Sequence, residues 1–184
     1  MIFEPLTIPG AHLLRAEPIA DERGHFARTF CQSELAAHGL DSRIAQASVS
    51  YNHRRSTLRG MHWQREPFAE TKIVSCLRGA VYDVMVDLRP DSSFYCRWIA
   101  NFLTEDDGCG LYVPRGVAHG FITLAEETVL SYQISERHSA AHSEGVRWDD
   151  PAFAIRWPTR NPILSERDRS YRDFVPDRAI APAH

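Results

Sequence analysis

The feature that most constrains the fold is a series of short strands, separated by turn residues, between about residues 44 and 135. Residues 80–89 show it best, because apolar side chains occupy every second position there and Asp83 and Asp87 fall on the opposite face. Further strands are predicted at residues 72–77, 98–103, 110–113, 121–124 and 129–135. The pattern favours an antiparallel sandwich or barrel and disfavours a doubly wound parallel fold.

The two aspartates of this alternating strand allow two interpretations. Asp83 and Asp87 lie opposite an apolar face, which is typical of an antiparallel strand with one side in water. We favour that interpretation, a solvated outer face. In a barrel, the same polar face could instead line an interior that holds a ligand. The alternation by itself leaves both interpretations open.

The rest of the chain is predicted to extend this barrel. We expect a single domain over residues 1–184, with the barrel at about 44–135 and N- and C-terminal extensions packed on it, because no repeat or Pro/Gly-rich linker interrupts the chain. A short helix is predicted around residues 33–39, with Ser33 as the N-cap and Gly39 as the C′ residue. From about Ala140 onward we expect irregular structure with one or two short helices.

Composition disfavours several classes of partner. The net charge of −3 gives no broad attraction to nucleic acid, so any anion must be held locally by a few arginines. No apolar run reaches the roughly 18–20 residues of a membrane span. The N-terminal segment lacks a basic start followed by an apolar stretch. We therefore expect a cytoplasmic protein, without a membrane partner, whose four cysteines are free thiols.

One histidine motif resembles a motif of the cupins. The spacing Pro114-x-Gly116-x-x-His119 is that of the second cupin motif, whose histidine points into the barrel. Metal-binding cupins combine it with His-x-His and a following Glu, whereas this chain has His62-Trp63-Gln64. Two histidines without a carboxylate are a poor site for a divalent ion. We therefore predict a pocket without a metal, which disfavours a metal-dependent oxygenase.

A histidine in such a pocket can act as a general base, because its ordinary pKa of about 6.5 permits proton abstraction near neutral pH. The base needs an acceptor, commonly a carboxylate, on its other ring nitrogen. Taken singly, His62 is more commonly a structural residue, and Ser165-x-x-Asp168 resembles a capping box at a helix start. Ordinary structural interpretations also exist for Tyr132 in a strand and for Lys72 at a strand start.

Several motifs nevertheless occur in one recognisable order. They are Asp21-x-Arg23-Gly24-x-Phe26, Leu58-Arg59-Gly60-Met61-His62-Trp63-Gln64, Lys72, residues 81–89, Pro114-x-Gly116-x-Ala118-His119-Gly120-Phe121, Tyr132, residues 143–150 and Leu164-Ser165-x-x-Asp168. Together they resemble the dTDP-4-dehydrorhamnose 3,5-epimerase family of nucleotide-sugar enzymes. The resemblance extends over about residues 19–174, most of the chain. Each piece alone is a weak signal, whereas the ordered set is a strong one.

The resemblance implies a mainly β fold, a double-stranded β-helix (a cupin-type jelly roll) with a few short helices, which works as a homodimer without a cofactor. It implies that His62 is the base and that Asp168 orients and charges it. Tyr132 is implied as the acid on the opposite face of the sugar, and Lys72 as the group that stabilises the enolate oxygen. These roles suit the chemistry, because a C–H beside a ketone is weakly acidic and inversion needs proton removal and delivery on opposite faces.

The resemblance also implies a substrate-binding set. Arg59, and Arg23 of the partner subunit, are implied to hold the diphosphate, because a guanidinium binds phosphate oxygens in pairs. At two further positions, and in the segment 46–50, the chain departs from the family pattern, which affects nucleotide or sugar selection. The implied set also contains His119, Gln46, Asp83, Phe26 and the two departing residues Arg28 and His138.

The implied activity is epimerisation at C3, C5 or both centres of a nucleotide-linked 4-keto-6-deoxyhexose. The leading expectation is conversion of dTDP-4-dehydro-6-deoxy-D-glucose to dTDP-4-dehydro-L-rhamnose. Related enzymes that invert only one centre share the same residues. A 3,4-ketoisomerase and a cupin that binds a sugar without catalysis are the remaining alternatives. The residues themselves do not identify the nucleotide as dTDP, CDP, UDP or GDP.

Overall fold

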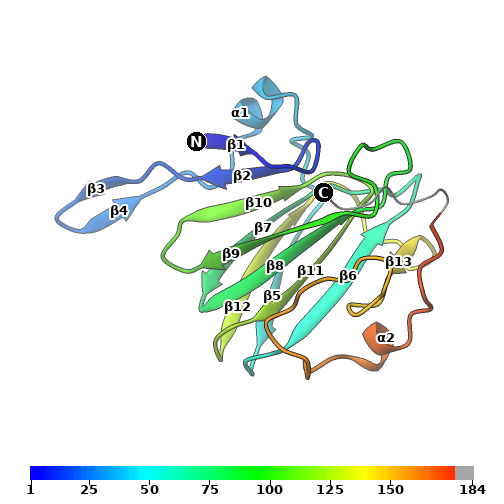
Figure 1. The fold of residues 1–184 in the computed structure, drawn as a ribbon. Coiled ribbons are helices and arrows are strands. Elements are labelled where there is room, and N and C mark those ends of the chain that lie inside the picture. Colours follow the sequence, from blue (N-terminus) through cyan, green and yellow to red (C-terminus); the bar gives the residue numbers. More distant parts are fainter. Residues whose placement is uncertain (177–184) are drawn as a thin grey trace.

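Two antiparallel β-sheets form the body of the protein in a computed structural model, which describes residues 1–176 (Figure 1). The six-stranded sheet has the order β1 (Ile2–Pro5), β2 (His12–Arg15), β10 (Cys109–Val113), β7 (Lys72–Arg78), β12 (Thr128–Ile134) and β5 (Gln46–Asn52). The five-stranded sheet has the order β13 (Ser143–Gly145), β6 (Leu58–Gln64), β11 (Val117–Thr123), β8 (Ala80–Asp87) and β9 (Trp98–Thr104). The predicted mainly β, jelly-roll class is confirmed.

The strands predicted from the sequence are present, with one shift. Strand β11 begins at Val117 rather than near residue 121, so the second histidine motif is itself a strand. It pairs antiparallel with β6, and His119 lies directly opposite His62. The two strands approach closely at two glycines: a Cβ on Gly60 would lie 2.5 Å from the Cα of Gly120. Glycine at both positions therefore brings the two histidines side by side.

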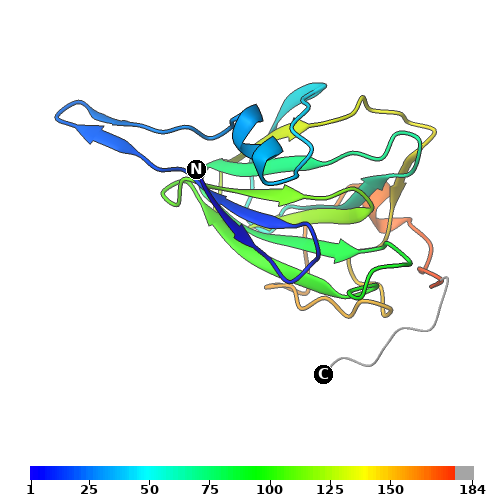
Figure 2. The same ribbon diagram turned by 90° about the horizontal axis from the view of Figure 1, so that it is seen from above.

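A two-stranded hairpin, β3 (Ile19–Asp21) and β4 (Gly24–Phe26), projects from the body as an arm, which is also visible from above (Figure 2). The predicted helix near residues 33–39 is α1 (Gln32–Ala37), but its N-cap is Cys31 and not Ser33. Gly39 has the left-handed φ of 69° that suits a C′ glycine. Within residues 1–176, no helix is long and apolar enough to cross a membrane. The cytoplasmic location stays a prediction.

The main core lies between the two sheets. Val74, Leu111 and Leu130 contribute to it from the six-stranded sheet, and Met85 and Phe121 contribute from the five-stranded sheet. Each of these side chains is at most 1% exposed. Burial of one such side chain stabilises the fold by about 1.5–3 kcal/mol. This core fixes the spacing of the sheets and thereby the strands that carry the functional side chains.

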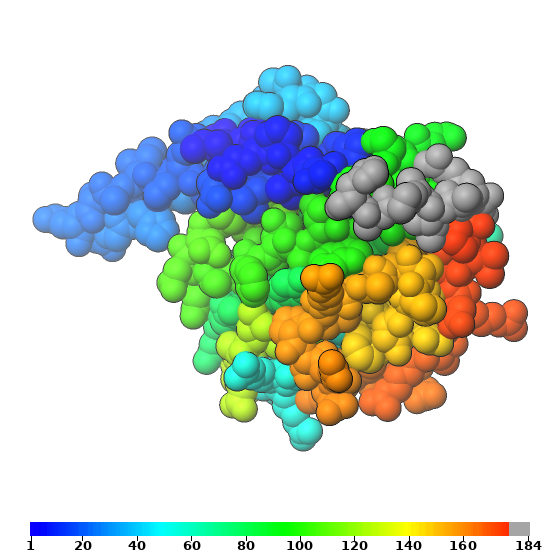
Figure 3. Space-filling view, viewed as in Figure 1, coloured from blue at the N-terminus to red at the C-terminus, as the bar shows by residue number. Residues whose placement is uncertain are grey.

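A second core covers the outer face of the five-stranded sheet. Val84 and Val86 of β8 pack there against Phe153 and Trp157 of the C-terminal segment. Figure 3 shows that segment, in orange to red, lying against the body. The apolar face of β8 is thus the outer one, and the polar face points inward. The favoured solvated outer face for Asp83 and Asp87 is wrong, because both carboxylates are 0% exposed.

Both buried aspartates have specific partners. Asp87 Oδ2 accepts a hydrogen bond from the Arg89 guanidinium at 2.6 Å and another from the Ser92 hydroxyl at 2.6 Å. Asp83 accepts from His119 at 2.8 Å. A buried carboxylate is tolerated only with such partners. Asp87 therefore anchors the end of its own strand, whereas Asp83 belongs to the histidine cluster. The assignment of residues 1–184 to a single domain stays a prediction.

Candidate active site

A cavity of about 380 Å³ lies between the two sheets. Strands β5, β7 and β12 of one sheet and β6 and β11 of the other line it, and helix α2 (Glu166–Arg169) closes one side. Eight of the residues expected to form the site line this cavity: His62, Asp168, Tyr132, Lys72, Arg59, Gln46, His119 and His138.

A short contact on the cavity wall joins β6 to α2. His62 Nε2 and Asp168 Oδ1 are 2.6 Å apart, and Asp168 is 3% exposed. Burial raises the pKa of the Asp168 carboxyl. The hydrogen bond and charge of His62, together with the Gly60 N–H and Ser165, lower this pKa by more than burial raises it. The pKa of Asp168 is therefore below its ordinary value. An ionised carboxylate therefore fixes the orientation of the imidazole and stabilises its protonated form.

One half of the predicted capping box is present at Asp168. Ser165 is the N-cap of α2, and its hydroxyl accepts a hydrogen bond from the Asp168 backbone N–H at 3.1 Å. The Asp168 carboxylate remains available for His62 because the cap uses only the backbone of this residue. The short helix therefore has a defined function in the architecture: it presents a buried carboxylate to the end of β6.

A second histidine–carboxylate pair lies beside the first. His119 Nε2 and Asp83 Oδ2 are 2.8 Å apart, and His119 is 4% exposed. Burial raises the pKa of the Asp83 carboxyl, and the charge and hydrogen bond of His119 oppose that rise. Asp83 was expected to line the pocket, but it is fully buried, on β8 beyond β11, and only His119 reaches the cavity wall. Asp83 thus acts on the cavity through His119.

Tyr132 and Lys72 project into the cavity from neighbouring strands. Burial, followed by the charge of Asp83, raises the pKa of the Tyr132 phenol well above its ordinary value, so the phenol stays protonated. The Tyr132 ring meets the His119 ring edge to face, with centroids 6.0 Å apart. Lys72 Nζ donates to the His62 carbonyl at 3.0 Å and pairs with Glu70 Oε1 at 3.0 Å. The cavity thus contains a neutral phenol, an imidazole and an ammonium group.

The mouth of the cavity carries polar and cationic groups. The Arg59 guanidinium donates to Asn52 Oδ1 at 2.8 Å and to the Tyr51 carbonyl at 3.5 Å, and the residue is exposed. Gln46 Oε1 accepts from the backbone N–H of His138 at 2.6 Å. Gln46 therefore holds the segment that brings His138 to the rim. An exposed arginine beside a cavity suits an anionic ligand.

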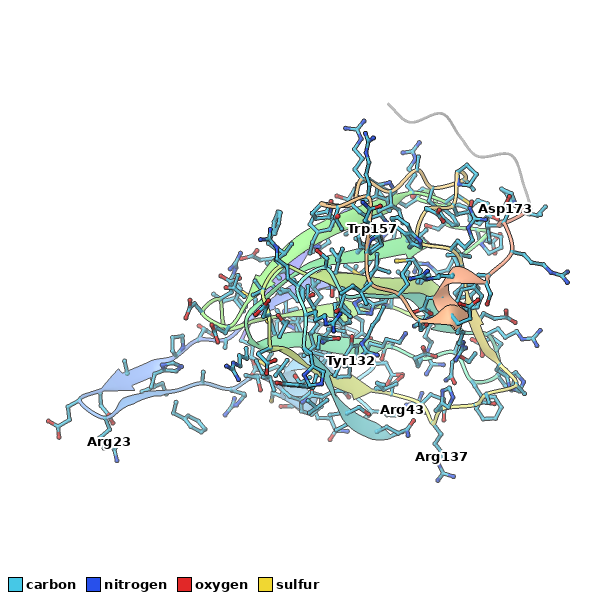
Figure 4. All side chains as sticks on the ribbon, turned by 90° about the horizontal axis from the view of Figure 1, so that it is seen from below. Arg23, Arg43, Tyr132, Arg137, Trp157 and Asp173 are labelled. Carbon is cyan, nitrogen blue, oxygen red and sulfur yellow. The ribbon has the colours of Figure 1, made fainter. Side chains whose placement is uncertain are left out.

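Three predicted binding residues lie outside this cavity, on or near the N-terminal arm. Figure 4 shows Arg23 at the far end of the arm, away from Tyr132. The Arg23 side chain is 84% exposed and pairs with Asp21, and Phe26 is 74% exposed. Arg28 pairs with Glu34 at 2.9 Å. Within one chain these three residues do not line the cavity, and the implied action of Arg23 in the site of a partner subunit stays a prediction.

The donor set does not fit a divalent metal ion. Gln64 replaces the second histidine of the metal motif, and its amide is used by the backbone: Nε2 donates to the carbonyls of Phe68 and Arg137, and Oε1 accepts from Ser139 N–H at 2.6 Å. Across the described residues, no group of three His, Cys, Asp or Glu side chains is arranged to hold a metal.

Sequence reasoning missed three residues around the His62–Asp168 pair. The Tyr171 ring meets the His62 ring at 6.1 Å, and its hydroxyl accepts from Arg167 Nε at 2.8 Å. Arg167 and Glu70 line the cavity. The adjacency of Arg167 to Asp168 was an available signal. Tyr171 had none, because its contact with His62 spans more than a hundred residues of sequence.

The comparisons with known proteins agree with this geometry. A sequence model of the dTDP-4-dehydrorhamnose 3,5-epimerase family matches residues 5–175. The chain belongs to this family. A dTDP-4-dehydrorhamnose 3,5-epimerase of Sinorhizobium fredii is 41% identical over 171 residues, which cover 92% of this chain and 88% of that relative. The relatives of this chain are thus isomerases, and their similarity extends over almost the whole chain.

Solved structures of the family have the same fold. The dTDP-4-dehydrorhamnose 3,5-epimerase of Bacillus anthracis, with TDP and PPi bound, superposes with a TM-score of 0.91 at 38% identity, covering 94% of this chain and 99% of that one. A 3′-monoepimerase of Streptomyces bikiniensis, in complex with dTDP-quinovose, has a TM-score of 0.85 at 32% identity, covering 92% and 86%. The family therefore includes both double and single epimerases.

Proposed function

We propose that this protein inverts C3 and C5 of a dTDP-linked 4-keto-6-deoxyhexose, converting dTDP-4-dehydro-6-deoxy-D-glucose to dTDP-4-dehydro-L-rhamnose. Membership of the epimerase family supports the reaction class. The observation that carries the assignment of roles is one cavity that holds the 2.6 Å His62–Asp168 pair together with Tyr132 and Lys72. Base, acid and oxyanion stabiliser are the three groups that the reaction needs.

The first step in this proposal is removal of a proton beside the ketone. His62 takes the proton from carbon, and the Asp168 carboxylate stabilises the imidazolium that forms. The electron pair of the broken C–H bond moves to the ketone oxygen and gives an enolate. Lys72 donates a hydrogen bond to that oxygen, and a preorganised donor of this kind lowers the barrier by about 3–4 kcal/mol.

The second step is return of a proton to the opposite face of the same carbon. The neutral Tyr132 phenol is suited to donate it, because desolvation keeps the pKa of the phenol high and its proton in place. The enolate collapses to the ketone, with the configuration inverted. The tyrosinate and the imidazolium then exchange protons with water, and the same pair acts at the second centre.

The substrate's diphosphate is assigned to Arg59 at the cavity mouth. We further propose a homodimer in which Arg23 and Phe26 of one arm complete the site of the other subunit. Their exposure supports this, since Phe26, an apolar side chain on the arm that is 74% exposed, is stabilised by burial against a second surface. The high similarity to the TDP-bound Bacillus anthracis structure supports a dTDP-linked substrate.

The direct test is incubation with dTDP-4-dehydro-6-deoxy-D-glucose, followed by NMR of the product's ring couplings. The proposal predicts the configuration of dTDP-4-dehydro-L-rhamnose, inverted at both C3 and C5. Inversion at C3 alone would match the Streptomyces bikiniensis monoepimerase and limit the reaction to one centre. Movement of the carbonyl to C3, or recovery of unchanged substrate from folded protein, contradicts the proposal.

A further inference from the structure

The ammonium group of Lys72 is held by two fixed acceptors. Its Nζ lies 3.0 Å from the His62 carbonyl oxygen and 3.0 Å from Glu70 Oε1. A lysine ammonium has three N–H donors in tetrahedral arrangement. Two of these are therefore used, and their directions determine the direction of the third. Since Lys72 lines the cavity, the third N–H is the one available to a ligand there.

Glu70 is a carboxylate in a largely buried position. Its side chain is 5% exposed, and it lines the cavity beside Lys72, whose side chain is 12% exposed. Its second oxygen, Oε2, is buried and accepts no hydrogen bond from any part of residues 1–176. Burying a carboxylate with one oxygen unsatisfied costs free energy. Such a cost is typical of a residue retained for a functional contact, and the contact that Glu70 makes is with Lys72.

We propose that Glu70 is a positioning residue that aims the third N–H of Lys72 at the ketone oxygen of the substrate. The His62 carbonyl alone leaves the ammonium free to rotate about that single contact. This inference deepens the proposed epimerase function and rests on it for the identity of the oxygen that Lys72 meets.

Three substitutions of Glu70 distinguish the effect of its acceptor oxygen from the effects of its charge and of its side-chain volume. Glu70→Gln keeps an acceptor oxygen at the same distance and removes the charge. Glu70→Met keeps a similar volume and removes the acceptor. Glu70→Asp keeps the charge but withdraws the oxygen by one methylene. Glu126→Met, on an exposed turn away from the cavity, is the matched control.

The measured quantities are kcat and KM for the dTDP-linked keto sugar. We expect kcat of the Glu70→Gln variant to stay within about threefold of the wild-type value. The Glu70→Met variant should have a kcat about 10-fold to 100-fold lower than wild type, and the Glu70→Asp variant a kcat about tenfold lower. KM should change less than threefold in each, because positioning acts on the enolate and not on the bound ground state. In a Lys72→Met background, Glu70→Met should have no further effect on kcat.

Three kinetic results overturn the inference. The first is wild-type kcat in Glu70→Met, or in Glu70→Asp if the Met variant does not fold. The second is an equal loss of kcat from Glu70→Met with and without Lys72. Equal loss of kcat in Gln and Met, with Asp fully active, shows that charge matters and the aimed oxygen does not, and this also overturns it.

A readout without turnover separates this inference from the proposed function. Lys72 is the only lysine in the sequence, so its ammonium should give one protected side-chain signal in ¹H–¹⁵N spectra, and Lys72→Met should lack that signal. We expect that signal to persist in Glu70→Gln and to be lost to solvent exchange in Glu70→Met. Persistence in both variants contradicts the role of Glu70, whatever reaction the enzyme catalyses. An inactive wild-type enzyme with the expected spectra contradicts the epimerase proposal alone.

Discussion

The imidazole of His62 and the carboxylate of Asp168 meet at 2.6 Å although 106 residues separate them in the sequence. The contact joins the end of a central strand to a four-residue helix near the end of the described chain. The helix is fixed by its own cap at Ser165 and by the chain that wraps the outer face of the sheet. A part of the chain outside the barrel therefore orients a side chain inside it.

Loss of this pair should abolish proton abstraction. We predict that His62→Ala lowers kcat by about 100-fold to 10,000-fold without unfolding the protein, because a positioned base contributes rate enhancement of that order. Asp168→Asn should lower kcat at least tenfold, since the amide cannot stabilise the imidazolium. Steady-state kinetics measure both effects, and Asp91→Asn, on an exposed turn, is the control. An Asp168→Asn variant with wild-type kcat contradicts the pairing.

Removal of the Tyr132 hydroxyl should separate the two half-reactions. In Tyr132→Phe, His62 can still remove the proton, whereas delivery to the opposite face is lost. We expect product formation to fall at least tenfold more than solvent exchange of the substrate C–H, measured by NMR in heavy water. Tyr82→Phe, which changes a tyrosine of the outer core, should leave both rates unchanged. Equal loss of exchange and turnover in Tyr132→Phe opposes the assigned role.

Arg59 should affect binding more than chemistry. A charge-assisted hydrogen bond is worth about 1.5–3 kcal/mol, so Arg59→Ala should raise KM by about 10-fold to 100-fold with kcat within threefold. The affinity for dTDP, measured by calorimetry, should fall by a similar factor. Arg78→Ala removes an exposed arginine at the end of β7 and should change neither value. A change confined to kcat is incompatible with a diphosphate contact.

Gly145 should be required because Tyr171 packs on it. A Cβ at residue 145 would lie 2.1 Å from Cζ of Tyr171, so Gly145→Ala must displace the ring that contacts His62. We predict a loss of about 1–3 kcal/mol in the free energy of unfolding and a fall in kcat. The double variant Gly145→Ala, Tyr171→Ala should recover part of both. Thermal unfolding and kinetics test the pair, and no recovery in the double variant speaks against this steric cause.

The buried phenol predicts a dependence of stability on alkaline pH. The ordinary pKa of tyrosine is 10.0, and burial raises the pKa of Tyr132 above it in the folded protein. Above pH 10 the unfolded chain therefore releases a proton that the folded chain retains, so the free energy of unfolding falls as pH rises. Denaturant unfolding between pH 9 and 11 should show a shallower fall in Tyr132→Phe than in wild type. Identical slopes contradict the raised pKa.

Local pattern predicted the strands well because hydrophobic alternation depends on neighbouring residues. It failed for the aspartates of β8. Alternation shows that a strand has two different faces, but which face is wet depends on what packs there. Phe153 and Trp157, some seventy residues later in the chain, cover the apolar face. Asp83 is consequently inside, where it holds His119.

In the candidate site, too, some residues could be predicted from the sequence, whereas others depend on contacts between distant segments. The order of the motifs carries the resemblance to the family, and that resemblance identified the eight cavity residues. The functions of Glu70 and Tyr171 depend on contacts across strands and on glycines that admit a ring, and neither leaves a periodic signal. Arg23, Phe26 and Arg28 lie outside the cavity of their own chain. The action of Arg23 and Phe26 in the site of a second subunit stays a proposal.

Deuterium uptake by the substrate in heavy water tests the central claim most directly. NMR should show one deuterium at C3 and one at C5 of the dTDP-linked keto sugar after incubation with wild-type enzyme. Neither position should exchange above the uncatalysed rate with His62→Ala. Absence of deuterium at both carbons, from folded protein that binds dTDP, contradicts abstraction by His62, as does unchanged exchange in the His62→Ala variant.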